Sequence, residues 1–76
     1  MNKLDIKQKN FIVYKLIPML NREPLSDFIQ VDGVHTSVYT ISEAMKVIIS
    51  VSLDGEYGSE EQSLLKYLTN MYKKSI

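Results

Sequence analysis

The stretch that determines the fold is residues 42–62, which read SEAMKVIISVSLDGEYGSEEQ. Its first half has apolar residues at steps of three and four, which predicts a helix over about 42–53 with Ser42 as its N-cap. Gly55 can then supply the left-handed conformation that often follows the end of a helix. Ser59, with a glutamine three residues later, matches a capping box and begins the next helix. We therefore predict a helix–loop–helix unit.

Helical patterns extend on both sides of this unit. Downstream, one apolar stripe continues beyond Ser59 and predicts the last helix over about 59–74. Upstream, apolar residues at steps of three and four predict another helix over about 4–20, with Pro18 kinking it or ending it near residue 17. A buried strand over 11–17 is the competing interpretation, and the length of the pattern favours the helix.

The segment between the first two helices contains a hairpin signal. Asp32-Gly33 lies between two runs rich in β-branched residues, which predicts a short β-hairpin over about 28–41 with a type I′ turn. Neither face of its second strand is cleanly apolar, so the register is weakly specified. The alternative for residues 21–41 is one helical turn followed by a loop. Together with three helices, the hairpin predicts a mainly helical α+β fold in a single domain, residues 1–76.

Composition narrows the class of protein. The chain has no cysteine, which excludes a disulfide framework, a thiolate metal site and a cysteine nucleophile. Nine Lys and Arg balance nine Asp and Glu, and Arg22 is the only arginine. Nucleic-acid binders usually carry a basic excess and use arginine to read bases, so nucleic acid is possible but disfavoured as a partner.

Targeting and membrane signals are weak in this sequence. The apolar run 11–20 is interrupted by Lys15 and Pro18, and no small-residue cleavage site follows it. No stretch approaches the roughly 20 apolar residues of a membrane span. We therefore expect a cytoplasmic protein that does not span a membrane.

Few residues are candidates for chemistry. His35 is the only histidine, and we interpret it as a strand residue at the surface or in a hydrogen bond. Acidic residues cluster around the turn between the last two helices, which makes a divalent-ion-responsive helix pair one alternative function, although the spacing fails the EF-hand pattern. The cluster comprises Asp54, Glu56, Glu60 and Glu61. We see no nucleophile–base pair and expect no enzyme activity, no catalytic residue, no cofactor and no bound metal.

Two short stretches resemble known families. Residues 39–47, YTISEAMKV, are similar to the opening of MerR-type and excisionase winged helix-turn-helix domains, where a short strand leads into the first helix. This resemblance implies a DNA-binding transcriptional regulator as a further alternative, although here the next helix opens with two glutamates. LDGE at 53–56 with SEE at 59–61 resembles the inter-helix turn of the tellurite-resistance, TerB-like helical family through common capping chemistry.

The strongest functional argument is an apolar excess on the first two helices. A 76-residue chain has one modest core, and these helices are apolar over more surface than it can cover. We therefore predict a small binding or regulatory protein, of bacterial, phage or plasmid origin by composition, that acts through protein contacts and forms a homodimer. Tyr57 in the loop and Tyr67 on the last helix are expected to be exposed. The candidate partner-binding residues are Tyr14, Ile17, Tyr57 and Tyr67.

Overall fold

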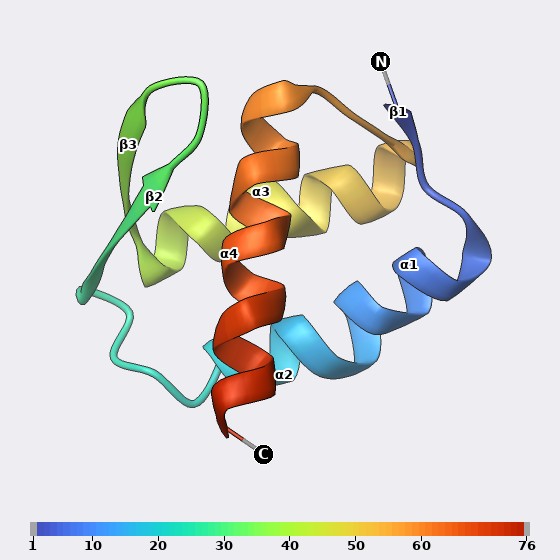
Figure 1. Ribbon diagram of the computed structural model, residues 1–76. Coiled ribbons are helices and arrows are strands. Elements are labelled where there is room, and N and C mark those ends of the chain that lie inside the picture. Colours follow the sequence, from blue (N-terminus) through green and yellow to red (C-terminus); the bar gives the residue numbers. More distant parts are fainter. Residues whose placement is uncertain (1, 76) are drawn as a thin grey trace.

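The protein has a mainly helical α+β fold in a computed structural model that describes residues 2–75. Its described part contains three helical rods and two small antiparallel two-stranded sheets (Figure 1). The last helix, α4, runs across the front of α3 and of the first rod, and the β-hairpin lies to one side. The predicted fold class is therefore confirmed.

The first rod joins three consecutive segments: α1 (Ile6–Phe11), a π-helical turn η1 (Ile12–Leu16) and α2 (Ile17–Leu20). Asp5 begins the rod with a capping box, which the sequence analysis missed. The helix passes Pro18 and reaches Leu20, which confirms the predicted end near residue 20. Of the two alternatives for Pro18, an end near residue 17 is wrong. A proline ring clashes with the carbonyl four residues earlier in a regular α-helix, and the wider π turn directly before Pro18 makes room for it.

The hairpin consists of β2 (Phe28–Asp32) and β3 (Thr36–Thr40), close to the predicted bounds. Its register pairs Phe28 with Thr40 and Asp32 with Thr36. The connecting loop therefore has three residues, 33–35, and Gly33 does not adopt positive φ. The predicted type I′ turn is wrong, and so is the alternative of a helical turn across this segment.

The central helix α3 (Ile41–Asp54) begins one residue before the predicted start of its pattern. Its N-cap is Thr40, not Ser42: the Thr40 side chain accepts a hydrogen bond from the backbone N–H of Glu43, whose carboxylate accepts one from the N–H of Thr40. Gly55 ends the helix with φ of 75°, as predicted.

The last helix α4 (Ser59–Ser75) is capped one residue earlier than the sequence analysis expected. The carboxylate of Glu61 accepts a hydrogen bond from the backbone N–H of Gly58 at 3.1 Å, so Ser59 lies inside the first turn. The loop before α4 also forms a strand that was not predicted. This strand, β4 (Glu56–Tyr57), pairs with β1 (Asn2–Lys3) and ties the start of the chain to the α3–α4 loop.

One apolar core lies where α4 crosses α3 and the first rod, and the inner face of the hairpin closes it. Ile48 at the centre of α3 is 0% exposed and Ile12 of η1 is 2% exposed. Ile17 is half-buried, and Ile49 is 38% exposed. The two rods therefore hide part of their apolar excess and leave part of it at the surface. The buried core comprises Ile12, Leu16, Leu20, Ile29, Val31, Ile41, Ala44, Ile48, Val51, Leu64 and Leu68.

Candidate functional site

The outer face of the hairpin carries exposed apolar side chains. In the antiparallel register, Phe28, Gln30 and Asp32 lie on the same side as Thr40, Val38 and Thr36, and this side faces away from the core. Phe28 is 73% exposed and Val38 is 59% exposed. Leu25, just before β2, and Val34, at the tip, are exposed as well. Val34 lines a small hollow with Val31 and Ser37 of the inner face and with α4, so it does not belong to the outer face. We call Leu25, Phe28 and Val38 the hairpin patch.

The inner face of the hairpin holds it against the protein. Ile29 and Val31 of β2 are buried in the core, and Val31 pairs with Ser37 of β3. The Ser37 hydroxyl donates a hydrogen bond to the carboxylate of Glu60 in the first turn of α4, at 3.3 Å. The strand pair that carries the hairpin patch on its outer face is therefore held against the core and α4 through its inner face.

The tip of the hairpin lies unusually close to α4. A Cβ atom on Gly33 would meet the Oγ of Ser63 and would lie 2.7 Å from its Cβ, closer than side chains pack. At the same tip, Nε2 of His35 is 3.6 Å from a carboxylate oxygen of Glu60. The interpretation of His35 as a surface residue is confirmed, although it lies in the loop and not in the strand. Glu60, its neighbour, is 25 residues away in sequence and was not foreseen.

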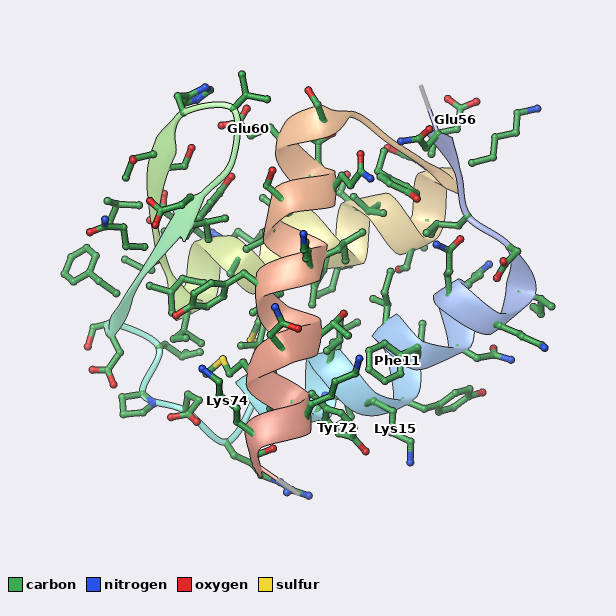
Figure 2. All side chains as sticks on the ribbon, in the orientation of Figure 1. Phe11, Lys15, Glu56, Glu60, Tyr72 and Lys74 are labelled. Atoms are coloured by element: carbon green, nitrogen blue, oxygen red, sulfur yellow. The ribbon has the colours of Figure 1, made fainter. Side chains whose placement is uncertain are left out.

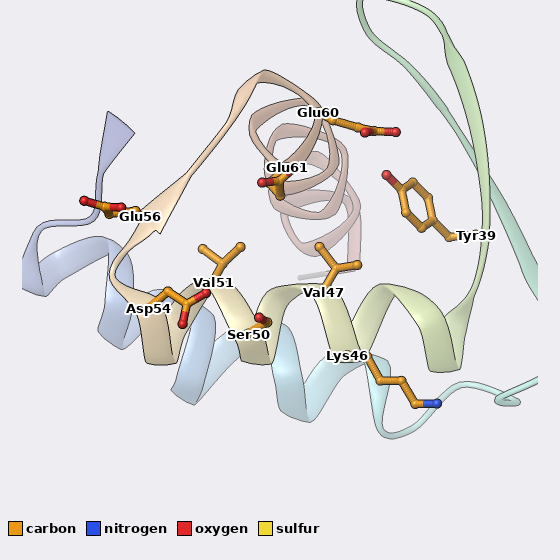
Figure 3. Close-up of a pocket in the computed structure, with 9 residues that line it drawn as sticks. All are labelled: Tyr39, Lys46, Val47, Ser50, Val51, Asp54, Glu56, Glu60 and Glu61. Carbon is orange, nitrogen blue, oxygen red and sulfur yellow. The ribbon is translucent and has the colours of Figure 1, made fainter. Parts of the chain in front are cut away.

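An open cleft of about 770 Å³ lies beside the hairpin (Figure 3). Val47 and Val51 of α3 form its apolar floor, and Tyr39 of β3 forms one wall. The acidic cluster of the α3–α4 turn lines the rest, with Lys46 as the only basic residue of the lining. The cleft is thus acidic, and it adjoins the inner side of the hairpin.

The pKa of Tyr39 reflects the negative charge around this cleft. Its hydroxyl points toward the first turn of α4 (Figure 3). Burial raises the pKa of Tyr39 above its ordinary value of 10.0, and the negative charges of Glu60 and Glu61 raise the pKa further, while a hydrogen bond with Ser37 acts in the opposite direction. Ionised Tyr39 would add a negative charge to an acidic site, so the folded protein favours the neutral phenol.

This shift predicts a loss of stability at alkaline pH. Because the pKa of Tyr39 is raised in the folded state, its contribution is complete below pH 10.0 and is lost as pH rises through the folded-state pKa. We expect Tyr39→Phe to reduce the fall in the urea midpoint that begins above pH 10.0. Tyr14→Phe, which changes a phenol on the exposed surface, serves as the control and should leave the wild-type fall in place. An unchanged fall in Tyr39→Phe would show that the phenol is not coupled to folding.

The acidic cluster does not converge on one point. Within residues 2–75, no group of three or more His, Asp or Glu side chains is arranged to hold a metal ion. Two of the four carboxylates already accept hydrogen bonds, Glu60 from Ser37 and Glu61 from Gly58. No observation of the site therefore favours the divalent-ion alternative.

The four candidate partner-binding residues do not form one surface. Tyr14 is 69% exposed on the first rod. Ile17, Tyr57 and Tyr67 are half-buried and pack against the core, so Tyr57 and Tyr67 are less exposed than we expected. Tyr14 lines the hollow between the first rod and the end of α4, and that lining contains none of the other three. Sequence reasoning missed the hairpin patch, because exposure of Phe28 and Val38 depends on which face of the hairpin packs inward.

The winged-helix alternative requires lysines beside the hairpin. Residues 28–40 contain no lysine or arginine, and the neighbouring first turn of α4 carries Glu60 and Glu61. A wing and recognition helix built from these elements would present negative charge to phosphates. No observation of this site favours DNA reading by the hairpin and α4.

Comparison with protein-family models, curated proteins and solved structures found no match to this chain. Among the described residues, no helix has the length and apolar character needed to cross a bilayer.

Proposed function

We propose that the protein is a small non-enzymatic binding protein that self-associates through the hairpin patch. The observation that carries the proposal is the gathering of three exposed apolar side chains, 55% to 73% exposed, within one fourteen-residue segment. Apolar clusters rimmed by polar residues mark protein contact sites, and here Gln30, Thr36 and Thr40 supply the rim. The cysteine-free composition suits action in the cytoplasm, which we include in the proposal.

A second copy is the partner that this surface fits most simply. Two hairpins related by a two-fold axis would cover the same patch on both copies, which is the usual geometry of homodimers. Three side chains make a small contact, so we expect micromolar affinity. The half of the chain that holds the hairpin is acidic, with eight of the nine Asp and Glu between residues 23 and 65. Salt should therefore strengthen this dimer by screening repulsion between like charges.

Substitutions on the patch test the proposal. We expect Phe28→Ser and Val38→Ser to convert the dimer to monomer at micromolar concentration, as measured by size-exclusion chromatography with light scattering. Both side chains face away from the core, so the variants should remain folded. Leu53→Ser is the matched control, because Leu53 is 78% exposed but lies at the end of α3. A control that dissociates as readily as the patch variants would assign the contact to another surface.

A further inference from the structure

The zero net charge of this protein is the sum of two parts of the sequence with opposite charges. Residues 2–22 and 66–75 contain eight of the nine Lys and Arg and one of the nine Asp and Glu, which gives them a formal charge of +7. Residues 23–65 carry −7. At about 0.1 M salt, charges more than about 10 Å apart are largely screened, so a ligand on one part responds to local charge and not to the net charge.

The two basic segments lie together in the fold. The ring of Phe11 in the first rod packs edge-on against the ring of Tyr72 in α4, with centroids 5.3 Å apart. Lys15 and Lys74 lie in the half of the molecule opposite to Glu56 and Glu60 (Figure 2). A hollow of about 350 Å³ joins the rod to the end of α4, and its lining includes Lys15, Arg22 and one acid, Glu23. We call five exposed cations of these two segments the basic face: Lys7, Lys15, Arg22, Lys73 and Lys74.

The π turn brings basic side chains of the rod to a common side. Lys15 of the rod and Arg22, which follows its end, line the same hollow and therefore lie on a common side. Lys7 and Lys15 are eight apart, but the π turn between them takes up one extra residue, so they too share a side. Tyr14, 69% exposed, lines the same hollow as Lys15 and Arg22. The row from Lys7 to Arg22 is roughly 20 Å long at 1.5 Å per residue.

These cations are not neutralised by the protein itself. In the described part of the chain, the only contact between oppositely chargeable groups within 4.0 Å joins His35 and Glu60. Lys73 and Lys74 also have a structural role, because cations stabilise the last turn of a helix. Lys7 and Lys15 lie inside the rod, away from its C-terminus, so the helix dipole does not explain them in the same way. Arg22 follows the end of α2.

We propose that the basic face binds the backbone of single-stranded nucleic acid, with Tyr14 stacking on a base. A row of cations about 20 Å long matches successive phosphates of a flexible strand, and an exposed aromatic ring among cations is typical of single-strand binding surfaces. Four of the nine carboxylates of a second copy are gathered at one cleft, and such a local cluster matches an extended row of cations less well than an extended strand does. This surface is separate from the hairpin patch, so the inference does not depend on the proposed dimer.

Fluorescence anisotropy with a labelled oligothymidylate of about 12 nucleotides tests the proposal. With about four phosphate contacts and a slope of about 0.7 per contact, affinity should fall about 50-fold between about 50 mM and 200 mM salt. We expect Lys15→Glu and Arg22→Glu each to weaken binding at least about tenfold and to reduce the salt slope. Tyr14→Ala should weaken binding and leave the salt slope unchanged, because stacking releases no counterion.

Lys46→Glu provides the matched control. It changes the net charge by the same amount as Lys15→Glu, but it lies on α3 in the acidic cleft. Binding of this variant within about twofold of wild type supports a local basic face. The proposal is overturned by an absence of binding at about 50 mM salt, by equal losses in Lys46→Glu and Lys15→Glu, or by equally tight binding of a duplex. Self-association that weakens with salt and requires the cleft carboxylates would likewise overturn it, by identifying a second copy as the occupant.

Discussion

Replacing Ile48 by alanine is expected to destabilise the protein by about 2–5 kcal/mol, the range for removing a large aliphatic side chain from a core. Ile48 is 0% exposed at the middle of α3, where the core meets helices on both sides. A 76-residue protein has a total stability of roughly 4–11 kcal/mol, so this one substitution removes a large part of it. Urea unfolding followed by circular dichroism measures the change.

The adjacent residue provides the control. Ile49 has the same side chain on the same helix but is 38% exposed, and we expect Ile49→Ala to cost about 1 kcal/mol or less. Both substitutions change helix propensity equally, so the difference between them isolates burial. Equal losses in the two variants would contradict the packing of α3 described above.

Adding one methyl group at Gly33 is expected to destabilise the protein by about 1–3 kcal/mol, the usual cost of overpacking. The new Cβ would lie 2.7 Å from the Cβ of Ser63 and would also meet its Oγ. That hydroxyl already donates a hydrogen bond to the carbonyl of Ser59, which limits its movement. The loss should come from separation of the hairpin tip from α4, so amide exchange of β2 and β3 should accelerate more than that of α3.

A double-mutant cycle with Ser63 tests this mechanism. Ser63→Gly removes both clashing atoms, at a cost of about 0.5–1 kcal/mol in helix propensity. Gly33→Ala combined with Ser63→Gly should therefore cost less than the sum of the two single changes. Ser63→Ala keeps the Cβ and should relieve the clash only in part. Additive losses would show that Gly33 is required for a backbone reason and not for its contact with α4.

The helices were predictable because local spacing determines them. In α3, apolar residues at 44, 48 and 51 give the buried stripe directly. Cap positions were less certain, because Thr40 competes with Ser42 and Gly58 with Ser59 for the same role. The π turn was not predicted, since the sequence marks only the proline and not how the helix accommodates it.

The candidate site depends on contacts between distant residues. Asp32-Gly33 correctly indicated a hairpin, but Gly33 is explained by Ser63 of α4 and not by a turn with positive φ. The register that exposes Phe28 and Val38 could not be derived from a strand with no clean apolar face. The uneven distribution of charge was visible in the sequence, although the two basic segments become one face only when α4 packs against the first rod.

Sedimentation equilibrium of the wild-type protein in the micromolar range, at low and at high salt, tests self-association through the hairpin patch most directly. The predicted result is an average mass that rises toward twice the monomer mass with concentration, and rises more steeply at high salt. A single monomer mass at every concentration in both buffers would contradict the account.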